Sequence, residues 1–399
     1  MARDSRWLQV ARPCRWAAQV MIVPCVALPL LAQSSRDSAG VRIVESPRPT
    51  WTAQERLRLA ASPRLIIGAS TAGPYEFRRV RGVMRLSDGR LAVADGGSTQ
   101  LRFFSPDGQF LTASAGVGNA PGQLASIEFV YRLRGDTIAL RSGLESAYLY
   151  TSTGDFVREM SLPGPPVGRR APRRYVHGMF TNGRRIASPI PNPAPRAAGT
   201  RWVDSLEVHI LAESGEVDVS LGLFPFLEFE QGADYPSPPW LSAIGVFAGG
   251  EDRLYAGFGD RYEIRVFSGT GALHSIFRRA WTPAPITPED WEEWVVEWSK
   301  LWVKEQGAAR DSAVNRVRRA PYATKLPAFS AFLVDRTGRL WVRGAHWEDA
   351  VGAGSYTDMP AVPSQWSVFD IVAGWARSRC RATSCPSRLA RITSRVRRG

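Results

Sequence analysis

The chain of 399 residues contains four histidines, the side chains that most often act as general bases or metal ligands near neutral pH. His177, His209 and His274 stand in or beside strand-like segments of different repeats, which predicts packed or solvated strand residues and no shared site. His346, in the loop sequence RGAHWED, is the best candidate of the four. The sequence has no Gly-x-Ser-x-Gly motif, no His-Glu-x-x-His motif and no Gly-rich phosphate loop that opens a helix. The motifs therefore indicate neither an activated nucleophile nor a zinc site.

The four cysteines lie near the two ends of the chain. Cys14 and Cys25 belong to the N-terminal segment, and Cys380 and Cys385 belong to an Arg-rich tail. The spacing of the second pair, C-x4-C, has no partner ligands beside it. We therefore expect no disulfide framework, no metal and no cofactor in the body of the protein.

The charge is also concentrated at the ends. The formal net charge is +14, but residues 371–399 alone contain eight Arg and no acidic residue, and residues 1–40 add five more Arg. Nucleic-acid binding needs a basic face on the folded part, whereas these are basic ends. We therefore expect no nucleic-acid partner.

The N-terminal residues have the pattern of an export signal. Arg12 and Arg15 precede the apolar run AAQVMIVPCVALPLLA, and polar QSSRDS follows it. We expect a signal peptide at residues 1–33 with cleavage near Ala32–Gln33, and a periplasmic or extracellular product. The run is too short and too interrupted by Pro for a stable membrane span. A lipid anchor is disfavoured because Cys25 follows Pro24 in the middle of the run, and a buried N-terminal helix is disfavoured by the polar break.

Short strand patterns repeat along the body of the chain. Residues 88–110 (DGRLAVADGGSTQLRFFSPDGQF), 135–157 and 251–277 each give a turn, an apolar strand, a loop, a second strand and a Gly turn before a third strand. Two looser copies carry insertions. Asp-Gly and Ser-Gly pairs supply the positive φ of tight hairpins. Small sheets of this kind bury their faces against one another, which predicts an all-β fold of the β-propeller type.

The segment VADGGSTQLRFFSPDGQFL with GVGNAPGQL resembles an NHL repeat, and the wider pattern over residues 41–370 resembles the exported bacterial six-bladed β-propellers. The resemblance implies blade one at strands 78–86, 90–94, 100–104 and 109–115. It implies blades two to five at about 127–162, 175–222, 241–280 and 328–370. Residues 65–68 (LIIG) would then be the outer strand of a sixth blade.

One helix is expected inside this β-fold. In TPEDWEEWVVEWSKLWVKE, about residues 287–306, Thr287 can cap the helix and Pro288 suits its first position. Trp291, Trp294, Trp298 and Trp302 then recur at helical spacing. We expect this Trp stripe to pack on the propeller body; the alternative is a platform for a ligand or partner.

The tail does not continue the repeat. After Asp370, earlier copies run into a Gly hairpin and an outer strand, but residues 371–399 show no sustained alternation. We expect either a disordered basic tail or the product of a shifted reading frame. In both cases the last blade would be incomplete: blade six would be missing apart from residues 65–68, and blade five would lack a proper outer strand.

Loops on one face of the expected propeller supply the candidate ligand residues. They are Asp95, Thr99, Arg141, Glu145, Asp260, Arg261, Arg343, His346 and Trp347. They would form a ring of mixed charge around the channel mouth, where this fold commonly binds its ligands.

Two functions fit this sequence. We expect an exported, non-catalytic binding protein whose partner is a small molecule, a glycan or a protein at the channel-mouth face. The alternative is a propeller hydrolase of the lactonase type, which would hold a divalent cation through channel-facing carboxylates. The predicted inner strands RRVRGVMRL, FVYRLR and AFSAFLV carry Arg and apolar residues but no carboxylate, which favours the binding protein.

Overall fold

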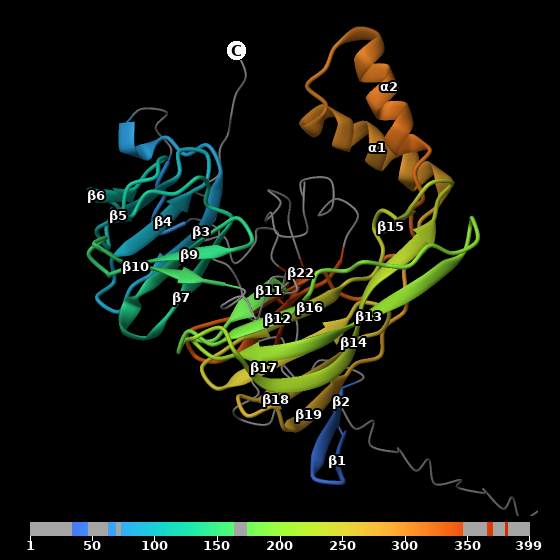
Figure 1. The fold of residues 1–399 in the computed structure, drawn as a ribbon, viewed down its shortest axis with the longest axis horizontal. Coiled ribbons are helices and arrows are strands. Elements are labelled where there is room, and N and C mark those ends of the chain that lie inside the picture. The colour runs from blue at the N-terminus through green and yellow to red at the C-terminus, as the bar shows by residue number, and fades with distance from the viewer. Residues whose placement is uncertain are drawn as a thin grey trace, which may run out of the picture. The chain divides into compact units, whose positions relative to one another are not determined.

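The computed structural model describes residues 34–46, 63–68, 73–162, 174–345, 365–369 and 380–381. Over these ranges the chain is mostly β, and its strands form five sheets that serve as the blades of a β-propeller (Figure 1). Among the strands of these described ranges, every pairing is antiparallel except that between β2 and β19. The described residues also form two α-helices and two single-turn 3-10 helices, at Gly73–Tyr75 and Arg134–Asp136.

Blades one and two are four-stranded sheets of consecutive strands. Blade one contains β3 (Val80–Arg85), β4 (Leu91–Asp95), β5 (Gln100–Phe104) and β6 (Phe110–Ala115). Blade two contains β7 (Phe129–Arg132), β8 (Ile138–Ser142), β9 (Ser146–Tyr150) and β10 (Phe156–Ser161). The Asp-Gly turns behave as the sequence predicts, because Gly89 and Gly108 both have φ of 93°, a conformation that costs glycine little.

Blade three is extended by a long hairpin. Its strands are β11 (Arg174–Met179), β12 (Arg185–Pro189), β13 (Arg201–Leu211), β14 (Val217–Gln231) and the short β15 (Pro236–Ser237). The pairing of β13 with β14 shifts register at three places, so this hairpin is irregular.

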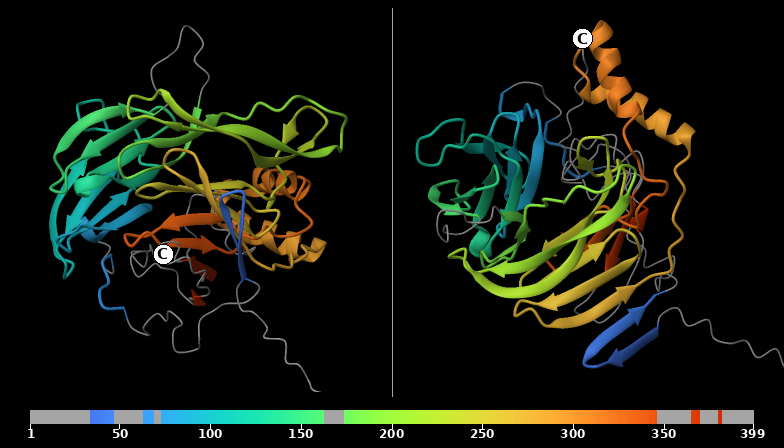
Figure 2. Two further views of the ribbon diagram at one scale, coloured as in Figure 1. Left: turned by 90° about the horizontal axis from the view of Figure 1, so that it is seen from below. Right: turned by 45° about the vertical axis from the view of Figure 1, so that its right-hand side comes forward.

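Blade four receives two strands from the N-terminal region. Its own strands are β16 (Gly245–Gly249), β17 (Arg253–Phe258), β18 (Glu263–Ser268) and β19 (Leu273–Arg278). The hairpin of β1 (Ser34–Ser38) and β2 (Val41–Glu45) joins its outer edge, where Arg42 to Glu45 pair with Ser275 to Arg278 (Figures 1 and 2). This makes a six-stranded sheet.

Blade five contains β20 (Ala331–Val334), β21 (Leu340–Arg343), β22 (Gln365–Phe369) and the two-residue β23 (Cys380–Arg381). The outer position, which the sequence predicted to lack a proper strand, therefore holds only a short one. Apart from these two residues, the tail at 371–399 lies outside the described residues, as does the expected signal peptide at 1–33.

The core lies between neighbouring blades, because alternate residues along a strand pack against the blade on either side. On β8, Ile138 and Leu140 pack toward blade one, whereas Ala139 packs toward blade three. The same alternation on β17 places Leu254 and Ala256 against blade three. Strands buried on both faces in this way read as continuous apolar runs, because each face meets another sheet.

The hairpins between the first and second strands of the blades contact one another in succession. The hydrogen bonds that join blades one to four run from Ser87 N to Asp136 Oδ2 (2.6 Å), from Arg134 N to Thr181 O (2.7 Å) and from Thr181 N to Gly250 O (3.3 Å). Arg336 of blade five donates to the carbonyl oxygens of Arg85 and Leu86 in blade one, at 3.4 Å each. The prediction of six blades is thus not confirmed, since the described part of the chain forms five.

The expected strand of a sixth blade takes another role. Residues 65–68 are not a strand; Leu65 and Ile67 pack instead against Phe77 and the outer face of blade one. Apolar composition alone did not distinguish a paired strand from an extended segment that covers a sheet.

Helix α1 (Pro288–Trp302) follows blade four at the predicted place. Asp290 N donates to Thr287 Oγ1 (3.1 Å) and Thr287 N donates to Asp290 Oδ2 (2.8 Å), which completes a capping box. A second helix, α2 (Gly307–Arg318), was not predicted. Its sequence GAARDSAVNRVR has no continuous apolar stripe, so helical periodicity is weak in it.

The Trp stripe of α1 is buried, but within a small core of its own. Trp294 is fully buried beside Trp240 (ring centroids 5.0 Å apart), and Trp291 stacks on Tyr322 (4.6 Å). Val314 and Val317 of α2 complete this core. The stripe therefore packs on α2, on the segments that enter and leave the insertion and on Trp240 between blades three and four, and less on the blades themselves than the sequence suggested. The side chain of Trp302 lies outside the described residues.

Candidate functional site

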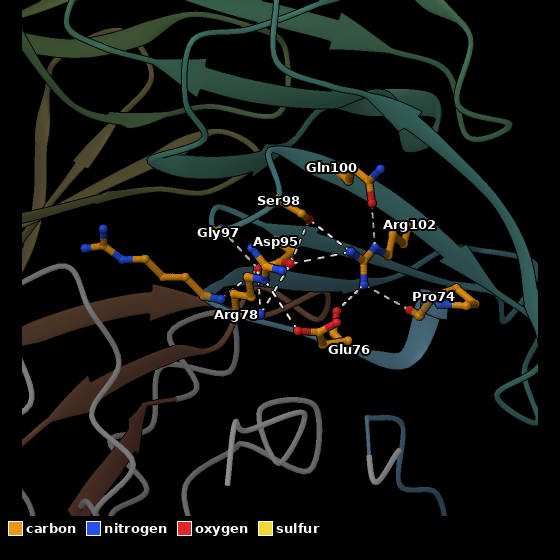
Figure 3. A network of polar contacts seen from close by, with 9 residues as sticks. Pro74, Glu76, Arg78, Asp95, Gly97, Ser98, Gln100 and Arg102 are labelled. Atoms are coloured by element: carbon orange, nitrogen blue, oxygen red, sulfur yellow. Dashed lines mark hydrogen bonds and ion pairs between the residues drawn. The ribbon is translucent and has the colours of Figure 1, made fainter. Parts of the chain in front are cut away.

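Asp95, the first candidate ligand residue, is fully buried at the end of β4 (Figure 3). Its carboxylate accepts hydrogen bonds from Arg79 N (2.7 Å), Ser98 Oγ (2.7 Å) and Gly97 N (3.2 Å), with Arg78 N at 3.3 Å. Arg102 Nη2 lies 3.7 Å away. The contacts occupy the carboxylate, so Asp95 orders the turn between β4 and β5.

Thr99 lies in the same turn and is buried as well. Its φ of 55° falls in the left-handed region, which a β-branched residue rarely adopts. The hydrogen bonds to Asp95 and Ser98 hold the turn in this conformation. The sequence analysis expected both residues in a binding loop; the structure places them at the end of β4 and in the turn after it, with their side chains buried.

Arg141 is a buried cation between blades two and three. Its Nε donates to Gly143 O (2.8 Å) and its Nη1 donates to Val176 O (3.0 Å). The guanidinium carbon lies 4.9 Å from the ring centroid of Phe129 and 4.8 Å from that of Tyr175. Such contacts stabilise a desolvated guanidinium and hold both rings in place.

Four rings of the innermost strands form a continuous aromatic row, made of Tyr131, Phe129, Tyr175 and His177. Phe129 and Tyr131 stack at 6.2 Å, and Tyr175 lies 5.1 Å from His177. Arg141 joins the two halves of the row. All four side chains remain partly exposed, although burial raises the pKa of Tyr131 to about 12. The row therefore offers ring surface on a rigid support.

His177 is the one histidine in this row. Its Nε2 lies 2.8 Å from Ser188 Oγ, and the rings of Phe247 and Phe226 lie 4.8 Å and 5.0 Å away. Burial lowers the pKa of His177 to about 3, and the charge of Arg141 acts in the same direction. Because Ser188 is fully buried, this His–Ser pair cannot reach a substrate in the described conformation.

The remaining candidate residues differ in their exposure. Glu145 is exposed, and Asp260 pairs with its neighbour Arg261 at 3.2 Å. Arg343 is buried, with Nε donating to Ser330 Oγ at 2.9 Å. His346 and Trp347 lie outside the described residues. The structure thus brings together Asp95 with Thr99 and Asp260 with Arg261, each within one turn.

The sequence analysis missed the aromatic row. Its signal is present in FVYR, where Phe129 and Tyr131 alternate, and in RYVHGM, where Tyr175 and His177 alternate. Period-two spacing places each pair on one face of its strand. That these two strands lie next to each other, on either side of Arg141, depends on the packing of the blades.

Neither α1 nor α2 combines the length and the apolar composition of a membrane-crossing helix, and they are the only α-helices of the described ranges. Within those same ranges, no three His, Cys, Asp or Glu side chains are grouped so as to hold a metal ion.

The sequence matches no protein-family model and no curated protein. Among solved structures, the chain is similar to a protein from Bacteroides fragilis NCTC 9343 that is described as exported (11% identity, TM-score 0.40, covering 79% of this chain and 73% of that one). It is also similar to virginiamycin B lyase from Staphylococcus aureus (12%, 0.32, 76% and 83%) and to a gluconolactonase from Xanthomonas campestris (13%, 0.31, 67% and 69%). Likeness at these values carries no conclusion about ligand or reaction.

Proposed function

We propose that this protein is an exported β-propeller that binds a ligand, without transforming it, on the aromatic row of blades two and three. The observation that supports this function is the position of Arg141 between Phe129 and Tyr175. The guanidinium fixes rings whose surface is partly exposed, so a ligand meets a preformed face. Preorganised rings bind more tightly because little side-chain entropy is lost on association.

The chemistry of the row favours a ligand with an apolar or ring-shaped face. Phenyl and phenol rings contribute apolar area and stacking geometry. Glu128 lies at the edge of the row, with its carboxylate 3.9 Å from Arg141 Nη2 and its side chain 37% exposed. It can accept hydrogen bonds from hydroxyl or amide groups of a small molecule, a glycan or a protein segment. This mode of binding uses only blades two and three, so it does not depend on whether the propeller has five blades or six.

Export forms part of the proposed function. Arg12, Arg15 and the apolar run before Gln33 support passage out of the cytoplasm, with cleavage near Ala32–Gln33. A periplasmic or extracellular location would bring the aromatic row into contact with ligands outside the cell.

The test is a screen of the purified mature protein against a glycan array and, by thermal shift, a small-molecule library. Any hit is titrated against the wild type and Tyr175→Ala. We expect Tyr175→Ala to weaken binding at least about tenfold, because it removes both stacking and buried ring area. Tyr235→Ala is the matched control, since Tyr235 is 69% exposed and lies between β14 and β15. Equal affinity for the wild type and Tyr175→Ala would refute the aromatic site.

The hydrolase alternative is tested with glucono-1,5-lactone and added divalent cations. We expect the wild type to leave the spontaneous hydrolysis rate unchanged. Cation-dependent acceleration that chelation abolishes would replace the binding function with the lactonase type.

A further inference from the structure

Arginines of blades two and five meet at the hairpin between β3 and β4. Arg132 Nη1 of blade two and Arg336 Nη1 of blade five both donate to the carbonyl oxygen of Arg85, at 3.3 Å and 3.4 Å. Arg336 Nη1 also lies 3.4 Å from Leu86 O. The guanidinium of Arg85 folds over the same hairpin, with its Nη2 next to Gly89. Blades two and five thus each bring one cation to this hairpin, which also carries Arg85 of blade one.

The negative charge beside this group is small and already engaged. Asp136 accepts hydrogen bonds from Ser87 N, Ser87 Oγ and Arg132, and it is 7% exposed. Burial acts to raise its pKa, but the hydrogen bonds from Ser87 and the charge of Arg132 hold that pKa below the ordinary value.

The acidic residues of the neighbouring turns are engaged within their own hairpins. Asp335 accepts from Thr337 N (2.8 Å) and Trp341 Nε1 (2.8 Å), and Asp88 accepts from Arg90 Nε (2.6 Å). Among the described residues, Arg336 therefore has two carbonyl oxygens as acceptors and no carboxylate. Counted together with Asp136 and Asp335, the three arginines leave a net charge of about +1 at the hairpin, from one charge per ionised side chain.

The contacts of Arg132 and Arg336 with these main-chain carbonyls are long. Donor–acceptor distances of 3.3–3.4 Å exceed the usual 2.9–3.0 Å, so these bonds are weak. Guanidinium groups bind tetrahedral oxyanions through short, charge-assisted and often bidentate hydrogen bonds. An oxyanion would also relieve the repulsion among three like charges.

We propose that Arg85, Arg132 and Arg336 form a binding site for an oxyanion of the phosphate type. Arg132 Nη1 and Arg336 Nη1 share the carbonyl oxygen of Arg85 as acceptor, so the two guanidinium groups lie close together, and the exposed side chain of Arg85 belongs to the same hairpin. The site lies at the inner hairpins and is independent of the aromatic row. The ligand is free phosphate or the phosphate group of an ester or lipid.

The experiment titrates the full mature protein with inorganic phosphate by calorimetry, with ionic strength held constant by sodium chloride. We expect saturable binding of one phosphate per chain. Arg336→Ala and Arg85→Ala should each weaken it at least about tenfold, the effect of losing one charge-assisted donor group. Arg316→Ala, which removes the same charge from an exposed position on α2, should leave the affinity within about twofold.

Arg85→Ala keeps the test valid if Arg336→Ala destabilises the fold, because the Arg85 side chain forms no hydrogen bond with the described residues. Absence of saturable phosphate binding, or equal weakening by Arg316→Ala, would overturn the site. A parallel arm uses phosphatidylglycerol vesicles. Vesicle binding that depends on Arg85 and Arg336 would identify a lipid source of the phosphate, whereas vesicle binding lost equally in Arg316→Ala would indicate nonspecific attraction and count against the site.

Discussion

Replacing Asp95 with alanine tests whether this residue maintains the fold or binds a ligand. The substitution removes the acceptor of the amides of Arg79 and Gly97 and of the Ser98 hydroxyl, and it leaves Arg102 without its nearest carboxylate. Arg102 keeps its hydrogen bonds to Pro74 O and Gln100 Oε1, but its charge is almost fully buried.

The magnitude follows from those contacts. Removing one partner of a buried ion pair costs about 3–5 kcal/mol. Each buried donor left without an acceptor costs about 1–3 kcal/mol, but water that enters the vacated space recovers part of this. We therefore expect Asp95→Ala to lower the free energy of unfolding by about 4 kcal/mol, and Tm by the order of 5–10 °C.

The assay is urea denaturation followed by Trp fluorescence and circular dichroism, together with a thermal scan. Asp260→Ala is the matched control, because Asp260 occupies the turn between β17 and β18, and its pair with Arg261 is exposed. The control should change stability by less than about 0.5 kcal/mol. A loss below about 1 kcal/mol in Asp95→Ala, combined with loss of ligand binding, would refute the structural role.

Three further outcomes are expected. Trp294→Ala should lower the free energy of unfolding by about 3–5 kcal/mol, because Trp294 is fully buried, whereas Val296→Ala on the exposed side of α1 should have little effect; equal effects in urea denaturation would contradict the insertion core. In the folded protein the pKa of His177 is about 3, so its side chain stays neutral down to that pH. Its contribution to stability is complete above about pH 6.5 and is lost progressively as the pH falls from about 6.5 to about 3. Denaturation measured against pH should show this dependence, about 1.4 kcal/mol per pH unit, and His177→Gln should reduce it; an unchanged slope would count against a neutral His177 in the folded protein. Intact-mass measurement of exported protein should give an N-terminus near Gln33, and retention of residues 1–32 on that protein would exclude cleavage.

Local patterns predicted the blades well. The strand expected at residues 100–104 is β5 as observed, and the one expected at 90–94 is β4 displaced by one residue. Alternation and Asp-Gly turns are short-range signals, so they survive whatever surrounds them. The capped start of α1 is equally local.

Contacts between residues far apart in the sequence could not be predicted from such local patterns. The sequence does not reveal that residues 65–68 would cover blade one without pairing, or that β2 would join blade four. The sequence analysis assigned Arg141 to a binding loop, whereas the structure places it on strand β8, just before the turn. Its position on β8 points it toward blade three, and only the packing of that blade identifies Phe129 and Tyr175 as its neighbours.

The parallel pairing of β2 with β19 sets an order of folding. Arg42 to Glu45 emerge early from the ribosome or the export channel, but their partners Ser275 to Arg278 follow only after three blades and most of the fourth. Closing so long a loop costs chain entropy that the pairing cannot repay until blade four is itself formed. The N-terminal strand is therefore expected to dock late, after the central blades have folded. Until it docks, the edge of β19 is an open template, so β19 is where a partly folded chain would recruit a second copy.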